Sequence, residues 1–194
     1  MNNQDLTIFK SFEDICRKTP SAPFLISPSR NQKGITTFSY QETFEKANKI
    51  STIFLDNGYG NNLRVATLLG STPAHYIVKL ALNKIGVSVV PINPDYSPDE
   101  TAYLLADSGS VLAICAEHYM QQLKTAIACK DLSVPIVTYD EIETIQTLKP
   151  LSDLGAQVHG KTEASLLYTS GTTGRPKGCI LSHEYEPVSY THLT

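Results

Sequence analysis

The sequence lacks two features that would place it at a membrane or on nucleic acid. No apolar run approaches the roughly 20 residues that a membrane-spanning helix needs. No block of five or more like charges occurs either, because 16 basic and 19 acidic residues are scattered over 194 positions and give a net charge of −3. We therefore expect no transmembrane segment and no nucleic-acid partner.

Paired cysteines and an apolar export signal are also absent. The four cysteines lie far apart, and no CxxC pair or compact Cys/His cluster suggests a thiolate metal site. We expect reduced thiols in a cytoplasmic protein, with the cysteines as buried bystanders. Cys179 follows Gly178 in an apolar stretch, so we expect it to be a buried small side chain rather than a nucleophile.

What the chain does contain is the composition of one globular domain, with 41% hydrophobic and 18% charged residues. Helical and extended patterns alternate along it. The predicted helices cover about 8–18, 40–57, 73–85, 98–108, 117–128 and 140–147. The predicted strands cover 23–27, 64–69, 87–92, 111–115, 134–138 and 164–168, with a second apolar stretch at 179–181 and a connector at 149–161.

Local signals support several of these helix boundaries. Ser39 with Glu42, and Ser97 with Glu100, have the spacing of capping boxes, and Gly86 is expected to end the third helix. Strands separated by helices of ten or more residues imply parallel pairing. The sequence therefore predicts an α/β fold of mostly parallel sheets flanked by helices, in which ligands bind at the carboxyl ends of strands.

The segment after the strand at 164–168 is rich in Ser, Thr and Gly. It comprises Thr169, Ser170, Gly171, Thr172, Thr173, Gly174, Arg175, Pro176 and Lys177. Small residues let backbone amides point inward together, hydroxyls add donors and the lysine adds a point charge, which suits an anionic phosphate chain. A solvated surface loop is the alternative interpretation, but apolar strands on both sides favour a loop held at its ends.

Two better-known nucleotide motifs are excluded by spacing. A P-loop has four residues between its glycines and a Ser or Thr after its lysine, whereas two residues separate Gly171 from Gly174 here, and Gly178 follows Lys177. The GxGxxG fingerprint of dinucleotide-binding sheets is also absent.

Residues 168–178 resemble the signature loop of the adenylate-forming (AMP-binding) superfamily, which includes acyl-CoA synthetases, nonribosomal peptide adenylation domains and luciferases. Residues 38–42 and 82–93 are similar to two earlier motifs of that family, in the expected order. The resemblance extends to about Tyr185 and implies part of the N-terminal domain of the adenylate-forming fold.

That resemblance implies a two-step reaction. A carboxylate attacks the α-phosphate of ATP to give an acyl-adenylate and pyrophosphate, and a thiol, usually that of coenzyme A, then displaces AMP. Residues 169–177 would hold the β- and γ-phosphates, with Lys177 as the catalytic cation and Thr169 as the residue that reaches Mg²⁺. The implied partners are a small carboxylic acid, ATP and coenzyme A.

Residues 91–105 and 178–183 resemble acyl-CoA ligases, including the carnitine/crotonobetaine type, more than peptide adenylation domains. Three alternatives remain: a peptide-synthetase adenylation domain, a non-catalytic nucleotide-binding module, and a purely structural α/β fragment. His183 is expected to be a surface or packing residue rather than a catalytic one.

The resemblance also sets expectations about domains. Residues 1–187 match the N-terminal portion of an AMP-binding domain, whose downstream motifs and C-terminal domain would lie further along. Residues 188–194 resemble the translation of a sequencing adapter and are expected to be a non-native tail. We expect these 194 residues alone to be inactive, because catalysis requires both reactants in attack geometry.

Overall fold

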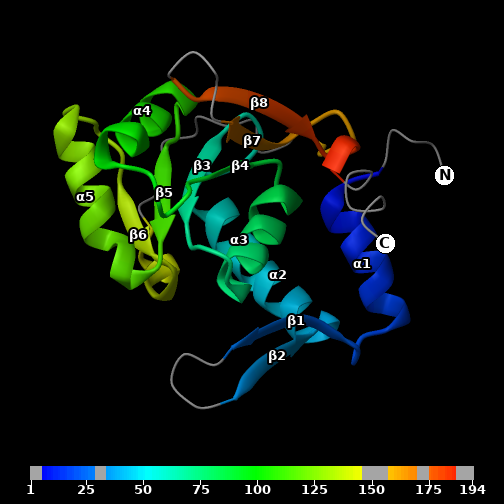
Figure 1. Cartoon of the computed structure of the whole chain (residues 1–194). Coiled ribbons are helices and arrows are strands. Elements are labelled where there is room, and N and C mark those ends of the chain that lie inside the picture. Colours follow the sequence, from blue (N-terminus) through cyan, green and yellow to red (C-terminus); the bar gives the residue numbers. More distant parts are fainter. Residues whose placement is uncertain (1–5, 29–33, 146–156, 170–174, 187–194) are drawn as a thin grey trace.

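The computed structural model describes residues 6–28, 34–145, 157–169 and 175–186. Helices and strands alternate along most of the chain (Figure 1). The α-helices are α1 (Ile8–Lys18), α2 (Tyr40–Asp56), α3 (Pro73–Lys84), α4 (Pro98–Ser108) and α5 (Met120–Cys129). The strands are β1 (Pro23–Pro28), β2 (Ile35–Ser39), β3 (Arg64–Leu68), β4 (Ser88–Pro91), β5 (Leu112–Cys115), β6 (Ile136–Thr138), β7 (Glu163–Thr169) and β8 (Lys177–Ser182).

The main sheet has the strand order β6-β5-β3-β4-β7-β8. All neighbouring strands in it are parallel except β7 and β8, which form an antiparallel pair. This arrangement confirms the predicted α/β fold with a mostly parallel sheet. Strand β7 meets β4 in register only at Ser165, opposite Val89, and its later residues pair with β8 alone among the described strands.

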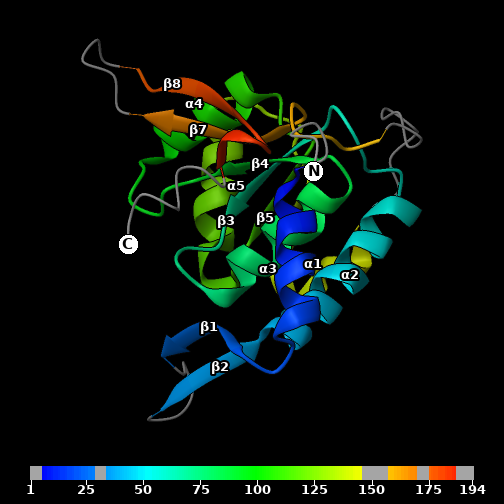
Figure 2. The same ribbon diagram turned by 90° about the vertical axis from the view of Figure 1, so that its right-hand side faces the viewer.

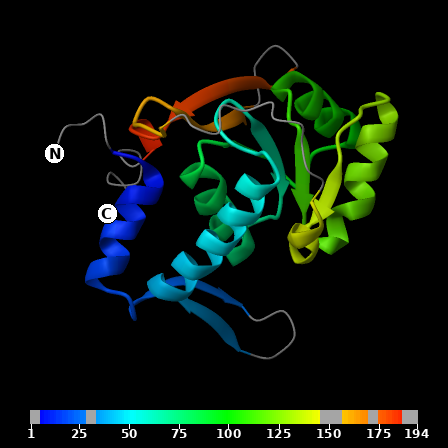
Figure 3. The same cartoon turned by 180° about the vertical axis from the view of Figure 1, so that it is seen from behind.

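The helices lie on both faces of this sheet, as Figures 1 and 3 show from opposite sides. Both faces of the sheet need a cover of helices because successive side chains of a strand point to opposite faces, and both sets are apolar here. Val65 and Val89 join the apolar cluster that includes residues of α1, α2 and α3, whereas Ala66 and Val90 join the cluster with α4 and α5. Both faces of the central strands are therefore buried, as parallel sheets require.

The two predicted capping boxes are present. The Ser39 hydroxyl accepts from the backbone N–H of Glu42 at 3.2 Å, and the Glu42 carboxylate accepts from the backbone N–H of Ser39 at 2.8 Å. Ser97 and Glu100 repeat this exchange at the start of α4. Helix α4 ends at Gly109, whose φ of 63° is left-handed, so the helix has a defined start and a defined end.

One strand was missed and one predicted helix needs correction. Strand β2 was not predicted, because most of it is exposed and it pairs only with β1 in a separate two-stranded sheet. The helix expected at 140–147 is a 3₁₀ helix (Tyr139–Thr144), and residues 146–147 lie outside the described ranges. Most of the expected connector, 149–156, also lies outside them.

The cysteines do not all behave as expected. Cys16 and Cys115 are buried, but Cys129 and Cys179 are exposed. The prediction for Cys179 was wrong because β8 is the last strand in the order of its sheet, and its first four residues are all exposed. An apolar sequence alone does not distinguish a central strand from an edge strand.

In the described part of the chain, no helix is long and apolar enough to cross a membrane.

Gly86 provides a test of this packing. Its φ is +77°, and a Cβ added to it would lie 1.5 Å from Oδ1 of Asn61. Gly109 has a similar φ of +63° but no atom within 4 Å of such a Cβ. We expect Gly109→Ala to cost about 1 to 2 kcal/mol of unfolding free energy from backbone strain alone. Gly86→Ala should cost roughly 2 kcal/mol more, because steric overlap adds to the same strain. Urea denaturation of both variants measures the difference, and equal losses would contradict the packing described.

Candidate functional site

The predicted phosphate loop joins the end of β7 to the start of β8. Thr169 and Lys177 are opposite each other in this antiparallel pair, and both are exposed. Figure 2 shows β7 and β8 side by side, with α4 close to them. Ser170, Gly171, Thr172, Thr173 and Gly174 lie outside the described residues, so the structure describes the two ends of the predicted loop and not its middle.

The strand register places cationic and hydroxyl groups together. Directly opposed residues of an antiparallel pair project their side chains on the same face, so the Thr169 hydroxyl and the Lys177 ammonium share a face. Arg175 is exposed and lies two residues before Lys177. Pro176, between them, has no N–H to donate to a sheet. Thr169, Arg175 and Lys177 therefore provide hydrogen-bond donors, two of them charged, at the end of the hairpin.

The other face of the hairpin is attached to α4 by a contact that the sequence did not reveal. The Tyr168 hydroxyl donates to Oδ2 of Asp107 at 2.7 Å, and the Tyr103 hydroxyl donates to Oδ1 of the same carboxylate at 3.4 Å. Burial, and then the bond to Asp107, raise the pKa of Tyr168 above its ordinary value. The i, i+4 spacing of Tyr103 and Asp107 was readable as a helical pair, but the 61-residue separation of Tyr168 from Asp107 was not.

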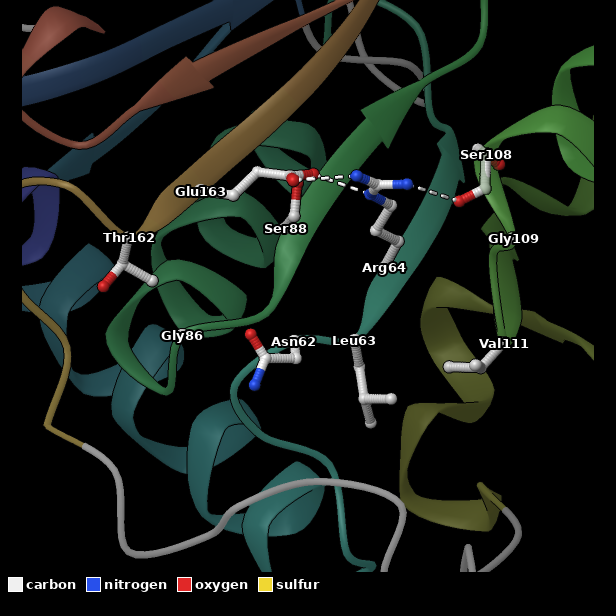
Figure 4. A pocket seen from close by; sticks show the side chains of 10 residues that line it. All are labelled: Asn62, Leu63, Arg64, Gly86, Ser88, Ser108, Gly109, Val111, Thr162 and Glu163. Carbon is white, nitrogen blue, oxygen red and sulfur yellow. Dashed lines mark hydrogen bonds and ion pairs between the residues drawn. The ribbon is translucent and has the colours of Figure 1, made fainter.

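An ion pair fixes the start of β7 (Figure 4). Arg64 of β3 donates to both carboxylate oxygens of Glu163, at 2.7 and 2.8 Å, and to the backbone carbonyl of Ser108 at 3.1 Å. Although burial acts to raise the pKa of Glu163, hydrogen bonds that include those from Arg64 hold it below its ordinary value. The hydrogen bond to Glu163 raises the pKa of Arg64.

These groups line a cavity of about 380 Å³. Its residues include Arg64, Ser88 and Glu163, which begin β3, β4 and β7. Ligands of parallel sheets bind at the carboxyl ends of strands, and this cavity is at the amino ends. Its charged groups are engaged with each other, as Figure 4 shows. We therefore interpret the Arg64–Glu163 pair as a structural connection rather than a ligand site.

His183 lies just beyond β8 and is fully buried. Its backbone N–H donates to the Thr162 carbonyl at 3.1 Å, and its Nδ1 accepts from the backbone N–H of Ile8, the first residue of α1, at 3.4 Å. Among the described residues, Nε2 has no partner. Burial lowers the pKa of His183 to about 4. This position agrees with the predicted packing role.

The polyphosphate of ATP fits the donor set at the end of the hairpin. The hydroxyl of Thr169 and the cationic groups of Arg175 and Lys177 suit a polyphosphate, and the nearby Asp107 carboxylate is already bonded to Tyr168. In the described ranges, no three His, Cys, Asp or Glu residues are grouped to hold a metal ion. Magnesium bound to nucleotide phosphates needs few protein ligands, so Thr169 as a magnesium-reaching residue stays a prediction.

Known proteins resemble this chain in sequence and in fold. A protein-family model described as AMP-binding enzyme matches residues 12–192. Tyrocidine synthase 2 of Brevibacillus parabrevis is 28% identical over 180 residues, which cover 93% of this chain and 5% of that protein. Gramicidin S synthase 2 of Brevibacillus brevis is 28% identical over 181 residues, which cover 93% of this chain and 4% of that protein.

Solved structures share the fold. A Mycobacterium tuberculosis fatty acyl CoA synthetase matches with a TM-score of 0.75 and 21% identity, covering 91% of this chain and 34% of that one. VinN in complex with 3-methylaspartate matches with a TM-score of 0.77 and 20% identity, covering 98% of this chain and 52% of that one. The chain thus spans about half or less of the length of these proteins.

The buried His183 predicts a pH dependence of stability. Its folded pKa of about 4 lies below its ordinary value of 6.5, so its contribution is complete above pH 6.5 and is lost as pH falls toward 4. We expect the unfolding free energy to fall by roughly 1 kcal/mol per pH unit in this window. His183→Asn, which offers a non-titrating acceptor to Ile8, should reduce the slope and leave the part that comes from His75, whose pKa is also lowered by burial. His118→Asn, at an exposed position, should leave the slope unchanged. An identical slope in all three proteins would contradict the assignment.

Proposed function

The chain belongs to the AMP-binding enzyme family, and from that premise we propose that the protein containing it activates a carboxylic acid with ATP. In this reaction the carboxylate oxygen attacks the α-phosphorus, the bond to the bridging oxygen breaks, and pyrophosphate leaves with the electron pair. The product is a mixed anhydride of the acid and AMP. The observation that carries the proposal is the pairing of Thr169 with Lys177 at the end of the β7–β8 hairpin.

The residues of the hairpin are proposed to stabilise the charge that moves onto the departing pyrophosphate. Lys177 supplies three N–H donors as a compact cation, and Arg175 supplies a planar guanidinium. The Thr169 hydroxyl adds a donor and is the proposed contact to Mg²⁺, which would neutralise phosphate charge when bound. Donors fixed in place before the reaction contribute most when charge develops in the transition state.

Coenzyme A is the proposed acceptor in the second step. The thiol attacks the acyl carbon of the adenylate, a thioester forms, and AMP leaves. The resemblance of residues 91–105 and 178–183 to acyl-CoA ligases supports this choice. One structural relative is described as a fatty acyl CoA synthetase, although identity of 21% supports only the shared fold.

The proposed location of the protein is the cytoplasm.

A carrier-protein thiol is the second candidate acceptor, and a specific observation favours it. Tyrocidine synthase 2 and Gramicidin S synthase 2 each match 93% of this chain, both at 28% identity. A further relative, from Bacillus subtilis, is described as a dimodular nonribosomal peptide synthase and is 28% identical over 75% of this chain. Acid activation is common to both candidates, so they differ only in the thiol that receives the acyl group.

The first experiment is ATP–pyrophosphate exchange by the protein that contains this chain together with its downstream sequence. We expect exchange that depends on a carboxylic acid, tested with panels of fatty acids and amino acids. Lys177→Met should lower kcat/KM about 100-fold, as expected for loss of a charged transition-state donor. Lys161→Met, an exposed lysine in the turn before β7, is the matched control and should have little effect. Exchange that no acid stimulates would refute the proposed function.

The second experiment distinguishes the acceptors. With the acid identified by exchange, coenzyme A and a phosphopantetheinylated carrier protein are supplied separately, and thioester formation is followed by mass spectrometry. We expect acyl-CoA to accumulate at a rate comparable with AMP release. Loading of the carrier protein without acyl-CoA would instead establish the peptide-synthetase alternative.

A further inference from the structure

Both ends of the predicted phosphate loop meet the same turn of α4. Tyr168 precedes the loop and bonds to Asp107 at 2.7 Å. Arg175 is the first described residue after 170–174, and its guanidinium carbon lies 5.5 Å from the centre of the Tyr103 ring. Tyr103 and Asp107 are four residues apart and therefore neighbours on the helix surface. The 3.4 Å hydrogen bond between them joins the two contacts into one cluster.

Gly178 lies against the ring of Tyr168. The two residues are opposite each other in the β7–β8 pair. A Cβ on Gly178 would lie 2.9 Å from Cδ1 of Leu166, and 3.4 and 3.5 Å from Cζ and Cε1 of Tyr168. The tyrosine ring thus lies against the face of Gly178 where a side chain would otherwise be, on its way to Asp107. A side chain at position 178 would therefore meet Leu166 first and would only touch the Tyr168 ring.

Helix α4 is well suited to hold these contacts. Ala102, Leu104 and Leu105 on its inner face are at most 1% exposed, so the helix is fixed against the sheet. Arg64 also donates to the carbonyl of Ser108, the residue after Asp107. A cation near the C-terminus of a helix is favourable because of the helix dipole. The cluster therefore rests on a packed element rather than on another loop.

The stability gained from these contacts is small. Asp107 is exposed, and cation–π contacts at exposed sites contribute only about 0.5 to 1 kcal/mol. Their geometric consequence is larger, because misplacing a binding group by about 1 Å reduces catalysis strongly. The residues adjoining Tyr168 and Gly178 are Thr169 and Lys177, the donors assigned to the phosphates. Any tilt of the hairpin relative to α4 moves both donors.

We propose that Asp107 and Tyr103 are positioning residues for nucleotide binding, which hold the two ends of the phosphate loop through Tyr168 and Arg175. This inference rests on the proposed function and extends it to two residues of a helix that has no expected contact with ATP. Asp107 acts through Tyr168, so their effects on ATP binding are coupled. Neither residue is a catalytic residue.

The test is a double-mutant cycle with Tyr168→Phe and Asp107→Ala. Both single variants and the double variant should raise the KM for Mg·ATP by about fivefold to tenfold, as expected for loss of a hydrogen bond to a charged group. Because the residues act as a pair, the double variant should be no worse than either single one. The KM for the acid should change less than twofold. Asp107→Asn, which keeps a neutral acceptor, should recover part of the loss.

Matched controls separate this role from a general loss of structure. Asp56→Ala removes an exposed carboxylate from the last turn of α2, as Asp107→Ala does from the last turn of α4, and should leave the KM unchanged. Tyr76→Phe removes the hydroxyl of a tyrosine that is 44% exposed and is the control for Tyr168→Phe. Additive effects, equal effects on acid and ATP, or effects no larger than those of the controls would overturn the inference.

Calorimetric titration of Mg·ATP into the same proteins makes the two proposals separable. If the wild-type protein binds Mg·ATP and the Tyr168 and Asp107 variants bind it more weakly, the positioning role is supported. This conclusion holds even if exchange is absent and acid activation is refuted. If the wild-type protein catalyses pyrophosphate exchange and the variants bind Mg·ATP with the wild-type affinity, the proposed acid activation is supported. The positioning role is then refuted. No binding by wild type overturns both.

Discussion

Arg64 makes the interaction on which the position of the candidate site depends. Its guanidinium is at the start of β3 and joins the carboxylate of Glu163 on β7 to the last carbonyl of α4, that of Ser108. Strand β7 needs such a connection because its register with β4 is limited to Ser165. The ion pair is partly buried on both sides, and its bidentate geometry restricts the direction in which β7 leaves the sheet. That direction determines where the hairpin end lies.

The register of β7 with β8 determines which chemical groups the site presents. An antiparallel pair places opposed residues on the same face, so Thr169 and Lys177 present a hydroxyl and an ammonium together. The next pair, Tyr168 and Gly178, faces the other way and contacts α4 through Asp107. Thr169 and Lys177 on one face are proposed phosphate donors, while Tyr168 on the opposite face makes the hydrogen bond to α4.

The sequence was sufficient to predict features that depend on local physics. Capping boxes such as that of Ser39, the end of the third helix near Gly86 and the alternation of helices with strands were all predicted correctly, because each rests on residues close together in the chain. The family, too, was recognisable from one loop. The exposure of Cys179 was mispredicted, and the Tyr168–Asp107 bond was missed, because both depend on which strands lie at an edge and which elements meet across the fold. Long-range pairing of that kind leaves no local signal.

The central claim is that the end of the β7–β8 hairpin binds the polyphosphate of ATP. The most direct measurement is a crystal structure of the protein that contains this chain, with Mg·ATP bound. We expect the β- and γ-phosphate oxygens within hydrogen-bonding distance of the Lys177 ammonium and the Thr169 hydroxyl, with Tyr168 still bonded to Asp107. Phosphates located at another part of the sheet, with Lys177 pointing into solvent, would contradict it.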